Sequence, residues 1–300
     1  MNIKAWIEAF RLRTLPLSLS CILMGTFLAS GDGFFRLDIF LLSTSTTILL
    51  QVLSNLANDY GDSIHGADSN HREGPARAVQ TGAITKSQMK KAIILFSVLA
   101  LITGCLLLFI TFRDRLLYLL LFLAMGLLAI FAAINYTAGK KPYGYKGLGD
   151  LAVFIFFGLV GVGGVYFLQA GVYNFFILLP AASCGLFATG VLNVNNIRDI
   201  ESDKLAGKIS IPVRLGRERA IFYHWALLTI GYSASCLFVL LNYHSLWQWL
   251  FLITLPLFVL NARAVYTKKT AIEIDPYLKQ LSIATLLFVI SFGVGLLLAY

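Results

Sequence analysis

Charge is what this sequence has least of. Lys, Arg, Asp and Glu make up 13% of its 300 residues, whereas a soluble globular domain carries about 25%. Hydrophobic residues reach 58%, and the mean hydropathy is +0.78. The deficit of charge excludes an ordinary soluble fold. It predicts an all-α, polytopic membrane protein.

Cysteine and histidine are also scarce. The four cysteines, Cys21, Cys105, Cys184 and Cys236, lie within apolar stretches and show no C-x-x-C or other metal spacing. This pattern excludes a disulfide framework, and the few histidines argue against a zinc site. No long linker or low-complexity segment divides the chain, so we expect a single domain over residues 1–300.

Nine apolar runs have the length of about 20 residues that crosses a bilayer. We place them at 14–31, 38–57, 89–110, 115–134, 149–168, 173–193, 220–241, 246–265 and 278–299. With the N-terminus in the cytoplasm, all 24 Lys and Arg except Arg36, Arg113 and Arg115 fall on the inner side. This asymmetry follows the positive-inside rule and puts the C-terminus outside. The net charge of +9 is then explained by topology and anionic membrane lipid, with no nucleic acid as partner.

Two acidic clusters directly follow apolar runs, at residues 55–68 (NLANDYGDSIHGAD) and 193–208 (NVNNIRDIESDKLAGK). Four predicted spans separate them, so both emerge on the cytoplasmic side. Carboxylates at the end of a membrane segment are costly and are typical of a functional site. Of the 15 acidic residues, the two loops hold Asp59, Asp62, Asp68, Glu73, Asp199, Glu201 and Asp203.

The aspartates of each cluster have helical spacing. Asp59 and Asp62 are three positions apart, and Asp199 and Asp203 are four apart, which places each pair on one helix face. Like charges repel there, and the helix dipole also disfavours anions at a C-terminal end. A cation must compensate, either from Lys and Arg or from a divalent metal. Oxygen ligands from Asp and Asn suit Mg²⁺ or Ca²⁺, and Mg²⁺ commonly shares its ligand positions with substrate phosphates.

Basic residues lie near both clusters and in a third inner loop, NYTAGKKPYGYKGLGD at 135–150. Carboxylate-bound metal and surrounding cations neutralise a departing diphosphate, while the apolar spans suit a hydrocarbon tail. The combination predicts a polyprenyl diphosphate as substrate. An ion-coupled secondary transporter is the alternative from another class. It is less favoured because transporters place their charges near the middle of the membrane, whereas these acids cluster at one end of the spans.

The motifs resemble those of the UbiA superfamily of intramembrane aromatic prenyltransferases. The first motif, N-D-x-x-D with a further Asp, is matched by Asn58, Asp59, Asp62 and Asp68, and the second, D-x-x-x-D, by Asp199 and Asp203. The longer interval to Asp68, the segment NNIRDIESDKLAGK, IPVRLG at 211–216, and Y-T-x-G followed by G-L-G-D (136–139 and 147–150) resemble the menaquinone branch, the MenA-type 1,4-dihydroxy-2-naphthoate polyprenyltransferases. At position 61 this chain has glycine where that branch usually has an aromatic residue. We expect this glycine to loosen the last helical turn.

The resemblance implies nine helices around a central cavity, in the cell inner membrane, with the active site facing the cytoplasm. It implies transfer of a polyprenyl group from an all-trans polyprenyl diphosphate to 1,4-dihydroxy-2-naphthoate. The ring attacks through the carbon that bears the carboxylate, and CO₂ and diphosphate are lost. The product resembles demethylmenaquinol, an intermediate of menaquinone biosynthesis. Another aromatic acceptor, such as a hydroxybenzoate, a haem or a chlorophyllide, remains open.

Pattern and resemblance together assign roles to individual residues. Catalysis is expected from Asp59, Asp62, Asp199 and Asp203; Mg²⁺ ligation from these four and Asp68; and diphosphate binding from Asn58, Tyr136, Lys140, Lys141, Arg198 and Lys204. All of these roles require Asp62 and Asp203 to lie close enough to share one diphosphate group.

Overall fold

The computed structural model describes residues 2–65 and 77–299, and within these ranges nine helical segments are long and apolar enough to cross a membrane. Their bounds are Ile3–Gly31, Leu37–His65, Lys86–Phe112, Leu116–Asn135, Gly149–Ala170, Phe175–Arg198, Arg217–Leu241, Leu246–Thr267 and Ala271–Leu297. Each corresponds to a span predicted from the sequence, so the all-α polytopic fold is confirmed. The second segment continues beyond position 57 and therefore carries Asp59 and Asp62 on a regular helix.

Several of these segments are composed of shorter helices. In chain order the elements are α1 (Ile3–Phe10), η1 (Leu12–Thr14), α2 (Leu15–Gly31), α3 (Leu37–His65), α4 (Lys86–Phe112), α5 (Leu116–Asn135), η2 (Tyr143–Lys146), α6 (Gly149–Val153), η3 (Phe154–Gly163), α7 (Gly164–Ala170), η4 (Phe175–Ile177), α8 (Leu178–Arg198), α9 (Ile200–Leu205), α10 (Ile211–Leu215), α11 (Arg217–Leu241), η5 (Leu246–Thr254), α12 (Leu255–Thr267) and α13 (Ala271–Leu297). The stretch η3 is wound as a π-helix.

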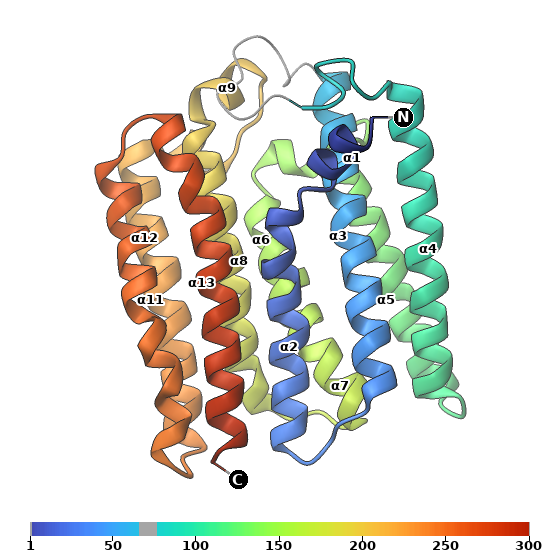
Figure 1. Cartoon of the computed structure of the whole chain (residues 1–300), viewed down its shortest axis with the longest axis vertical. Helices are drawn as coiled ribbons and strands as arrows, with labels where there is room; N and C mark the ends of the chain where they lie inside the picture. Colours follow the sequence, from blue (N-terminus) through green and yellow to red (C-terminus); the bar gives the residue numbers. More distant parts are fainter. Residues whose placement is uncertain (1, 66–76, 300) are drawn as a thin grey trace.

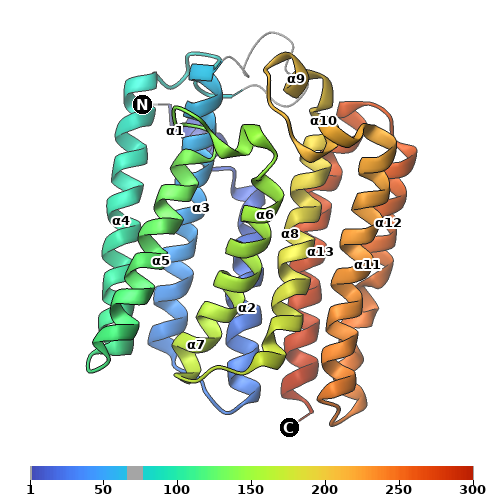
Figure 2. The same ribbon diagram turned by 180° about the vertical axis from the view of Figure 1, so that it is seen from behind.

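The long helices form two groups with a pair of elements between them (Figure 1). On one side stand α3, α4 and α5, and on the other α8, α11, α12 and α13, while α2 and the segment α6–η3–α7 lie between the groups (Figure 2). The short helices α1 and α9 lie at the same end of the bundle, opposite the C-terminus (Figure 1). We call this end, which also carries residues 136–148, the motif end.

The second group of helices packs closely around aromatic side chains. Aromatic rings fill the core between α8, α11, α12 and α13, and the ring of Phe187 lies 4.6 Å from that of Phe258 and 5.0 Å from that of Phe288, centroid to centroid. The fifth segment also packs closely on α8, because a Cβ on Gly158 would come within 2.7 Å of the Ala181 carbonyl oxygen. Small residues commonly permit such contacts between membrane helices.

Local signals explain where some helices begin. Thr85 and Gln88 form a capping box at the start of α4, and Thr270 and Glu273 form another at the start of α13. Each box satisfies backbone N–H groups that the first helical turn leaves without partners. Pro16 lies in the first turn of α2, where its missing N–H costs nothing.

Candidate active site

Two pairs of aspartates are buried at the motif end. Asp59 and Asp62 project from the last turns of α3 with 2% and 5% of their surface exposed, and Asp199 and Asp203 flank the first turn of α9 with 7% and 6% exposed. The backbone N–H of Asp203 donates to the carbonyl of Asp199 over 2.8 Å, so this pair has the helical relation expected from its spacing. Carboxylates at such depth require cationic or hydrogen-bonding partners.

Two arginines meet the first pair. Arg11 forms an ion pair with Asp59, and Arg77 with Asp62; the Nε of Arg77 also lies 3.6 Å from Asp59. Arg11 occupies the break between α1 and η1 with φ +49°, in the left-handed region that non-glycine residues rarely adopt. This backbone turn brings the N-terminal segment against α3.

Arg198 and Lys208 meet the second pair. The guanidinium of Arg198 donates from Nε and Nη2 to the two carboxylate oxygens of Asp199, each over 2.7 Å. Such two-pronged bonds are among the strongest that a carboxylate makes. Lys208 Nζ donates to Asp203 Oδ1 over 3.1 Å. Among the described residues, basic side chains therefore supply the cationic partners that both acidic pairs require.

The loop between α5 and α6 joins the two motifs. The hydroxyl of Tyr145 donates to Asp62 Oδ1 over 2.8 Å, and the Tyr145 carbonyl accepts from the Ile209 N–H over 2.9 Å. One residue before Ile209, the Lys208 N–H donates to the Asp203 carbonyl over 2.9 Å. Burial raises the pKa of the Tyr145 phenol, and the charges of both Asp62 and Asp203 raise it further. The structure thus brings the two distant motifs around one loop.

Asp203 is compensated only in part by Lys208. Burial raises its pKa to about 6, the Lys208 ammonium opposes that shift, and the charges of Asp199 and Asp62 add to it. Its Oδ2 accepts no hydrogen bond, although it lies 3.1 Å from Lys208 Nζ. A further cation beside this oxygen would therefore be stabilising.

A polar cavity of about 500 Å³ opens between the motifs. Its charged and amide-bearing lining comes from Glu8, Arg11, Arg13, Gln51, Asn58, Asp59, Asp62, Arg77, Asn195, Asn196, Arg198, Lys208 and Lys279. Asp199 and Asp203 do not line it; they lie behind the side chains of Arg198 and Lys208. Asn196 adds a buried amide oxygen that has no hydrogen-bond partner, so the cavity offers both cations and an oxygen ligand.

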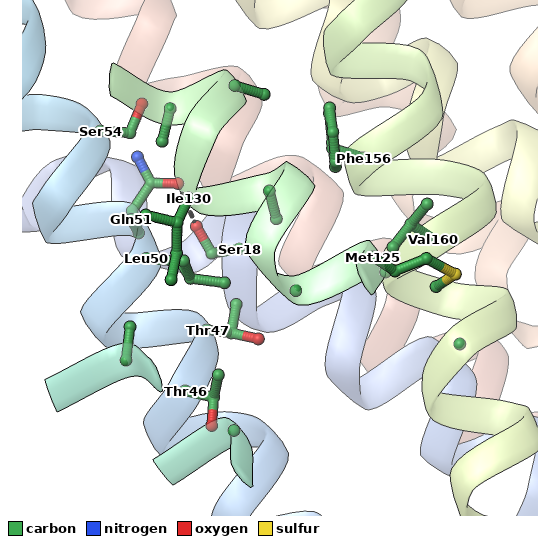
Figure 3. A pocket seen from close by; sticks show the side chains of 18 of the residues that line it. Ser18, Thr46, Thr47, Leu50, Gln51, Ser54, Met125, Ile130, Phe156 and Val160 are labelled. Atoms are coloured by element: carbon green, nitrogen blue, oxygen red, sulfur yellow. Dashed lines mark hydrogen bonds between the residues drawn. The ribbon is translucent and has the colours of Figure 1, made fainter. Parts of the chain in front are cut away.

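An apolar cavity of about 390 Å³ continues from the polar one into the bundle. The two share the lining residues Gln51, Asn58, Tyr136, Val153, Phe157 and Leu192. Leu50, Ile130 and Phe156 contribute apolar walls deeper in, together with a row of hydroxyls on α3 that includes Thr46 and Thr47 (Figure 3). A molecule with an anionic head and a hydrocarbon tail matches this pair of cavities.

The sequence-predicted diphosphate residues divide into two groups. Asn58, Tyr136 and Arg198 line the polar cavity. Lys204 instead pairs with Glu201 over 3.1 Å on the exposed side of α9, because residues three apart meet on a helix surface. Lys140 and Lys141 are exposed, and like Lys204 they line neither cavity. Asp68 lies outside the described residues.

Three side chains of the site are not among the site residues predicted from the sequence. Arg11 pairs with Asp59, Tyr145 bonds to Asp62, and Asp275 accepts a hydrogen bond from Arg198. In the sequence Arg11 indicates only the membrane topology, although its position just before the first span is a usable signal for the site. Asp275 begins the ninth span, far from either motif in sequence, and carried no such signal.

Gly61 has a different role from the one expected. The helix α3 stays regular through His65, so glycine does not loosen its last turn and that expectation was wrong. A Cβ at this position would lie 2.4 Å from the carbonyl carbon of Thr137 and 2.6 Å from the Ala138 nitrogen. Glycine is needed because the loop after α5 crosses α3 at this point. Thr137 Oγ1 then reaches Asn58 Oδ1 over 3.0 Å.

The atoms that the site offers as metal ligands suit Mg²⁺. The two acidic pairs and Asn196 provide only oxygen, and Asp203 and Asn196 each keep an oxygen without a hydrogen bond. No three acidic, His or Cys side chains in the described part of the chain converge closely enough to form a protein-only metal cage. Mg²⁺ is commonly held by one or two carboxylates together with substrate phosphates. Asp59 and Asp62, which line the polar cavity, fit that arrangement directly.

Comparisons with known proteins agree with this geometry. The chain matches the UbiA prenyltransferase family over residues 18–283. It is 44% identical to the 1,4-dihydroxy-2-naphthoate octaprenyltransferase of Escherichia coli (strain K12), covering 99% of this chain and 96% of that protein. Among solved structures, the apo UbiA homologue of Aeropyrum pernix K1 has a TM-score of 0.68 at 17% identity, covering 96% of this chain and 98% of that one. The UbiA homologue of Archaeoglobus fulgidus, bound to GPP and Mg²⁺, has a TM-score of 0.55 at 19% identity, with coverage of 94% and 99%. This chain therefore belongs to the UbiA prenyltransferase family.

Proposed function

We propose that this protein transfers a polyprenyl group from a polyprenyl diphosphate to 1,4-dihydroxy-2-naphthoate, the prenylation step of menaquinone biosynthesis. The observation that carries the proposal is the junction of the polar cavity, flanked by the two aspartate motifs, with the apolar cavity inside the bundle. The name of the 44% identical relative supports this acceptor and an octaprenyl donor. Membership of a prenyltransferase family argues against the transporter alternative.

The donor is proposed to bind across the junction of the cavities. Its diphosphate would lie in the polar cavity near Arg11, Arg77 and Arg198, and its tail would pass Tyr136 and Phe157 into the apolar cavity. Asn58 marks the boundary and is held there by Thr137. This arrangement places the allylic carbon, where the head joins the tail, at the boundary between polar and apolar walls.

Mg²⁺ is the cofactor that we propose for the diphosphate head. Asp59 and Asp62 would hold it from one side and Asp199 and Asp203 from the other, in keeping with their oxygen donors. When bound, the metal neutralises charge on the diphosphate oxygens. The A. fulgidus relative bound to GPP and Mg²⁺ supports this assignment.

The chain's own residues then have three tasks in the reaction. The carbon–oxygen bond of the donor breaks with its electron pair on diphosphate, and the arginines stabilise the charge that develops there. The apolar walls, including Phe156 and Phe157, exclude water from the allylic cation. The ring carbon that bears the carboxylate forms the new carbon–carbon bond, and CO₂ leaves while its bonding electrons return to the ring.

We further propose that the protein resides in the bacterial inner membrane with the motif end in the cytoplasm. The distribution of Lys and Arg supports this orientation. Lys140 is exposed at the motif end, so a cysteine introduced there should react with a membrane-impermeant reagent in inverted vesicles and not in right-side-out vesicles. Labelling only in right-side-out vesicles would contradict the orientation.

The reaction itself is tested with purified protein in lipid nanodiscs. The assay contains octaprenyl diphosphate, 1,4-dihydroxy-2-naphthoate and Mg²⁺ under anaerobic conditions, and mass spectrometry identifies the product. We expect the mass of the decarboxylated, prenylated naphthoquinol, and its loss when a chelator removes the metal. Prenylation of 4-hydroxybenzoate in preference to the naphthoate would overturn the assignment of the acceptor.

A further inference from the structure

The polar cavity has a second side that the donor does not need. Its residues shared with the apolar cavity come mainly from α3, the loop after α5 and the fifth segment. The opposite wall is formed by Leu17 of α2, Ala188 and Val191 of α8, and Leu278 and Ser282 of α13. The helices α2, α8 and α13 pack against one another, so this wall is a fixed surface, apolar except for the Ser282 hydroxyl.

Lys279, which directly follows Leu278, is one of the cations beside this wall. It lines the polar cavity from α13 and is exposed there. The other Arg and Lys side chains of the lining, Arg11, Arg13, Arg77, Arg198 and Lys208, each pair with an aspartate. Within residues 2–65 and 77–299, no ion pair involves Lys279.

The absence of an ion pair for Lys279 in the described part of the chain has a structural cause. Asp275 lies four residues earlier on α13, the spacing at which an acid and a lysine ordinarily pair. Its two carboxylate oxygens are already engaged, Oδ1 by Arg198 and Oδ2 by Arg13 over 3.3 Å. The ammonium of Lys279 is therefore available to an anion that enters the cavity.

We propose that Lys279 binds the carboxylate of the aromatic acceptor, whose ring lies against the wall of Leu17, Val191 and Leu278. The inference rests on the proposed function and adds the acceptor subsite to it. A flat hydrophobic ring with one anionic substituent matches an apolar wall beside a cation that makes no ion pair among the described residues. The acceptor then faces the donor across the polar cavity, with its reactive carbon directed to the junction where the allylic carbon lies.

The reaction gives this arrangement a consequence for product release. The acceptor enters as a carboxylate anion, and the carboxylate departs as neutral CO₂. The prenylated ring therefore has no group left to pair with Lys279, and the enzyme holds its acceptor more tightly than its product. Hydrogen bonds to charged groups are stronger than neutral ones, so the difference should be measurable in binding.

Two naphthols that differ only in the carboxylate test the proposal. Binding of 1-hydroxy-2-naphthoate and of 1-naphthol is measured by calorimetry on the protein in nanodiscs, without donor. For Lys279→Ala we expect the affinity for 1-hydroxy-2-naphthoate to fall about tenfold or more, with that for 1-naphthol unchanged. Lys279→Arg should recover most of the loss. The matched control is Lys269→Ala, a lysine near the start of α13 that is exposed and lines neither cavity.

Turnover measurements separate this inference from the proposed function. For Lys279→Ala we expect the KM for 1,4-dihydroxy-2-naphthoate to rise about tenfold, with the KM for octaprenyl diphosphate unchanged. An increase in the KM for octaprenyl diphosphate alone would assign Lys279 to the diphosphate and overturn the inference. Equal losses of affinity for the two naphthols, or no change in either affinity, would also overturn it. If the unmodified protein fails to prenylate the naphthoate while Lys279 still discriminates the two naphthols, the proposed function fails and the anion site stands.

Discussion

Arg198 donates a hydrogen bond from Nη1 to Oδ1 of Asp275, a residue 77 positions later in the chain. The same guanidinium holds both oxygens of Asp199, and Asp275 also accepts from Arg13. These contacts join the second aspartate motif, the start of α13 and the N-terminal segment. Because the Arg198 side chain is only 2% exposed, its orientation depends on these carboxylates and not on water.

Replacing Asp275 should therefore impair catalysis although Asp275 belongs to neither motif. Asp275→Asn removes the charge that positions Arg198, and charge-assisted bonds contribute about 1.5–3 kcal/mol each. We expect kcat/KM for the donor to fall about tenfold, measured by product formation at varied donor concentration. Glu201→Gln, which alters only an exposed pair with Lys204, should keep its rate because such surface pairs contribute little. Equal rates for the unmodified protein and Asp275→Asn would contradict the positioning role.

The aspartates of both motifs should be indispensable. Asp62→Ala and Asp203→Ala are each expected to abolish turnover, because each removes a proposed Mg²⁺ ligand and unbalances the cations beside it. Membrane insertion and thermal unfolding should show that both variants still fold. Mg²⁺-dependent rates near those of the unmodified protein in both variants would refute the assignment.

Tyr145 should affect the rate less than the aspartates do. In Tyr145→Phe the hydroxyl that bonds Asp62 over 2.8 Å is lost, while the backbone bond from Ile209 remains. One hydrogen bond to a charged group corresponds to about a tenfold effect, and we expect kcat to fall by that factor or less. A rate as low as that of Asp62→Ala would mean that the phenol takes part in the chemistry itself.

Much of the fold, and the aspartates of the site, could be predicted from the sequence. Lengths of apolar segments predicted the nine helices, and repeated aspartate spacing singled out Asp59, Asp62, Asp199 and Asp203. Both signals are local: a helix must span the bilayer, and residues three or four apart share its face. The prediction that the motifs meet relied on counting spans, and the structure brings them together through the loop that carries Tyr145.

The residues that surround these aspartates could not be predicted from the sequence in the same way. Arg11, Asp275 and Lys279 lie in the first and ninth segments, and α2 packs against α13. Arg11 and Lys279 then line the polar cavity, whereas Asp275 reaches the site through its hydrogen bond from Arg198. Charge alone favoured Lys140, Lys141 and Lys204 as diphosphate ligands, yet these side chains line neither cavity. A count of basic residues in a loop does not distinguish those that point inward from those that remain in water.

Asp203 should give the protein a measurable pH dependence. Its pKa is raised to about 6, mainly by burial, from an ordinary value of about 3.9. The folded state therefore binds the proton more tightly, and stability is expected to decrease as pH rises from about 4 to about 6 and to be constant above that. Unfolding of metal-free protein at several pH values should show this decrease, and Asp203→Asn should make it smaller. A decrease of the same size in Asp203→Asn would assign it to another group.

Gly61 provides a prediction about the fold beneath the site. An alanine methyl group at this position would lie 2.4 Å from the carbonyl carbon of Thr137, and backbone atoms cannot yield as a flexible side chain can. The loop that carries Tyr136 and Tyr145 must then move away from α3, and overpacking of this kind costs about 1–3 kcal/mol. We expect Gly61→Ala to lower the unfolding temperature and to lose activity. The matched control for stability is Gly126→Ala, since a Cβ on Gly126 meets no atom within 4 Å and alanine is the better helix former. Equal unfolding temperatures for the two variants would show that the contact between the loop and α3 tolerates a side chain at position 61. Another interaction would then have to hold Tyr145 beside Asp62.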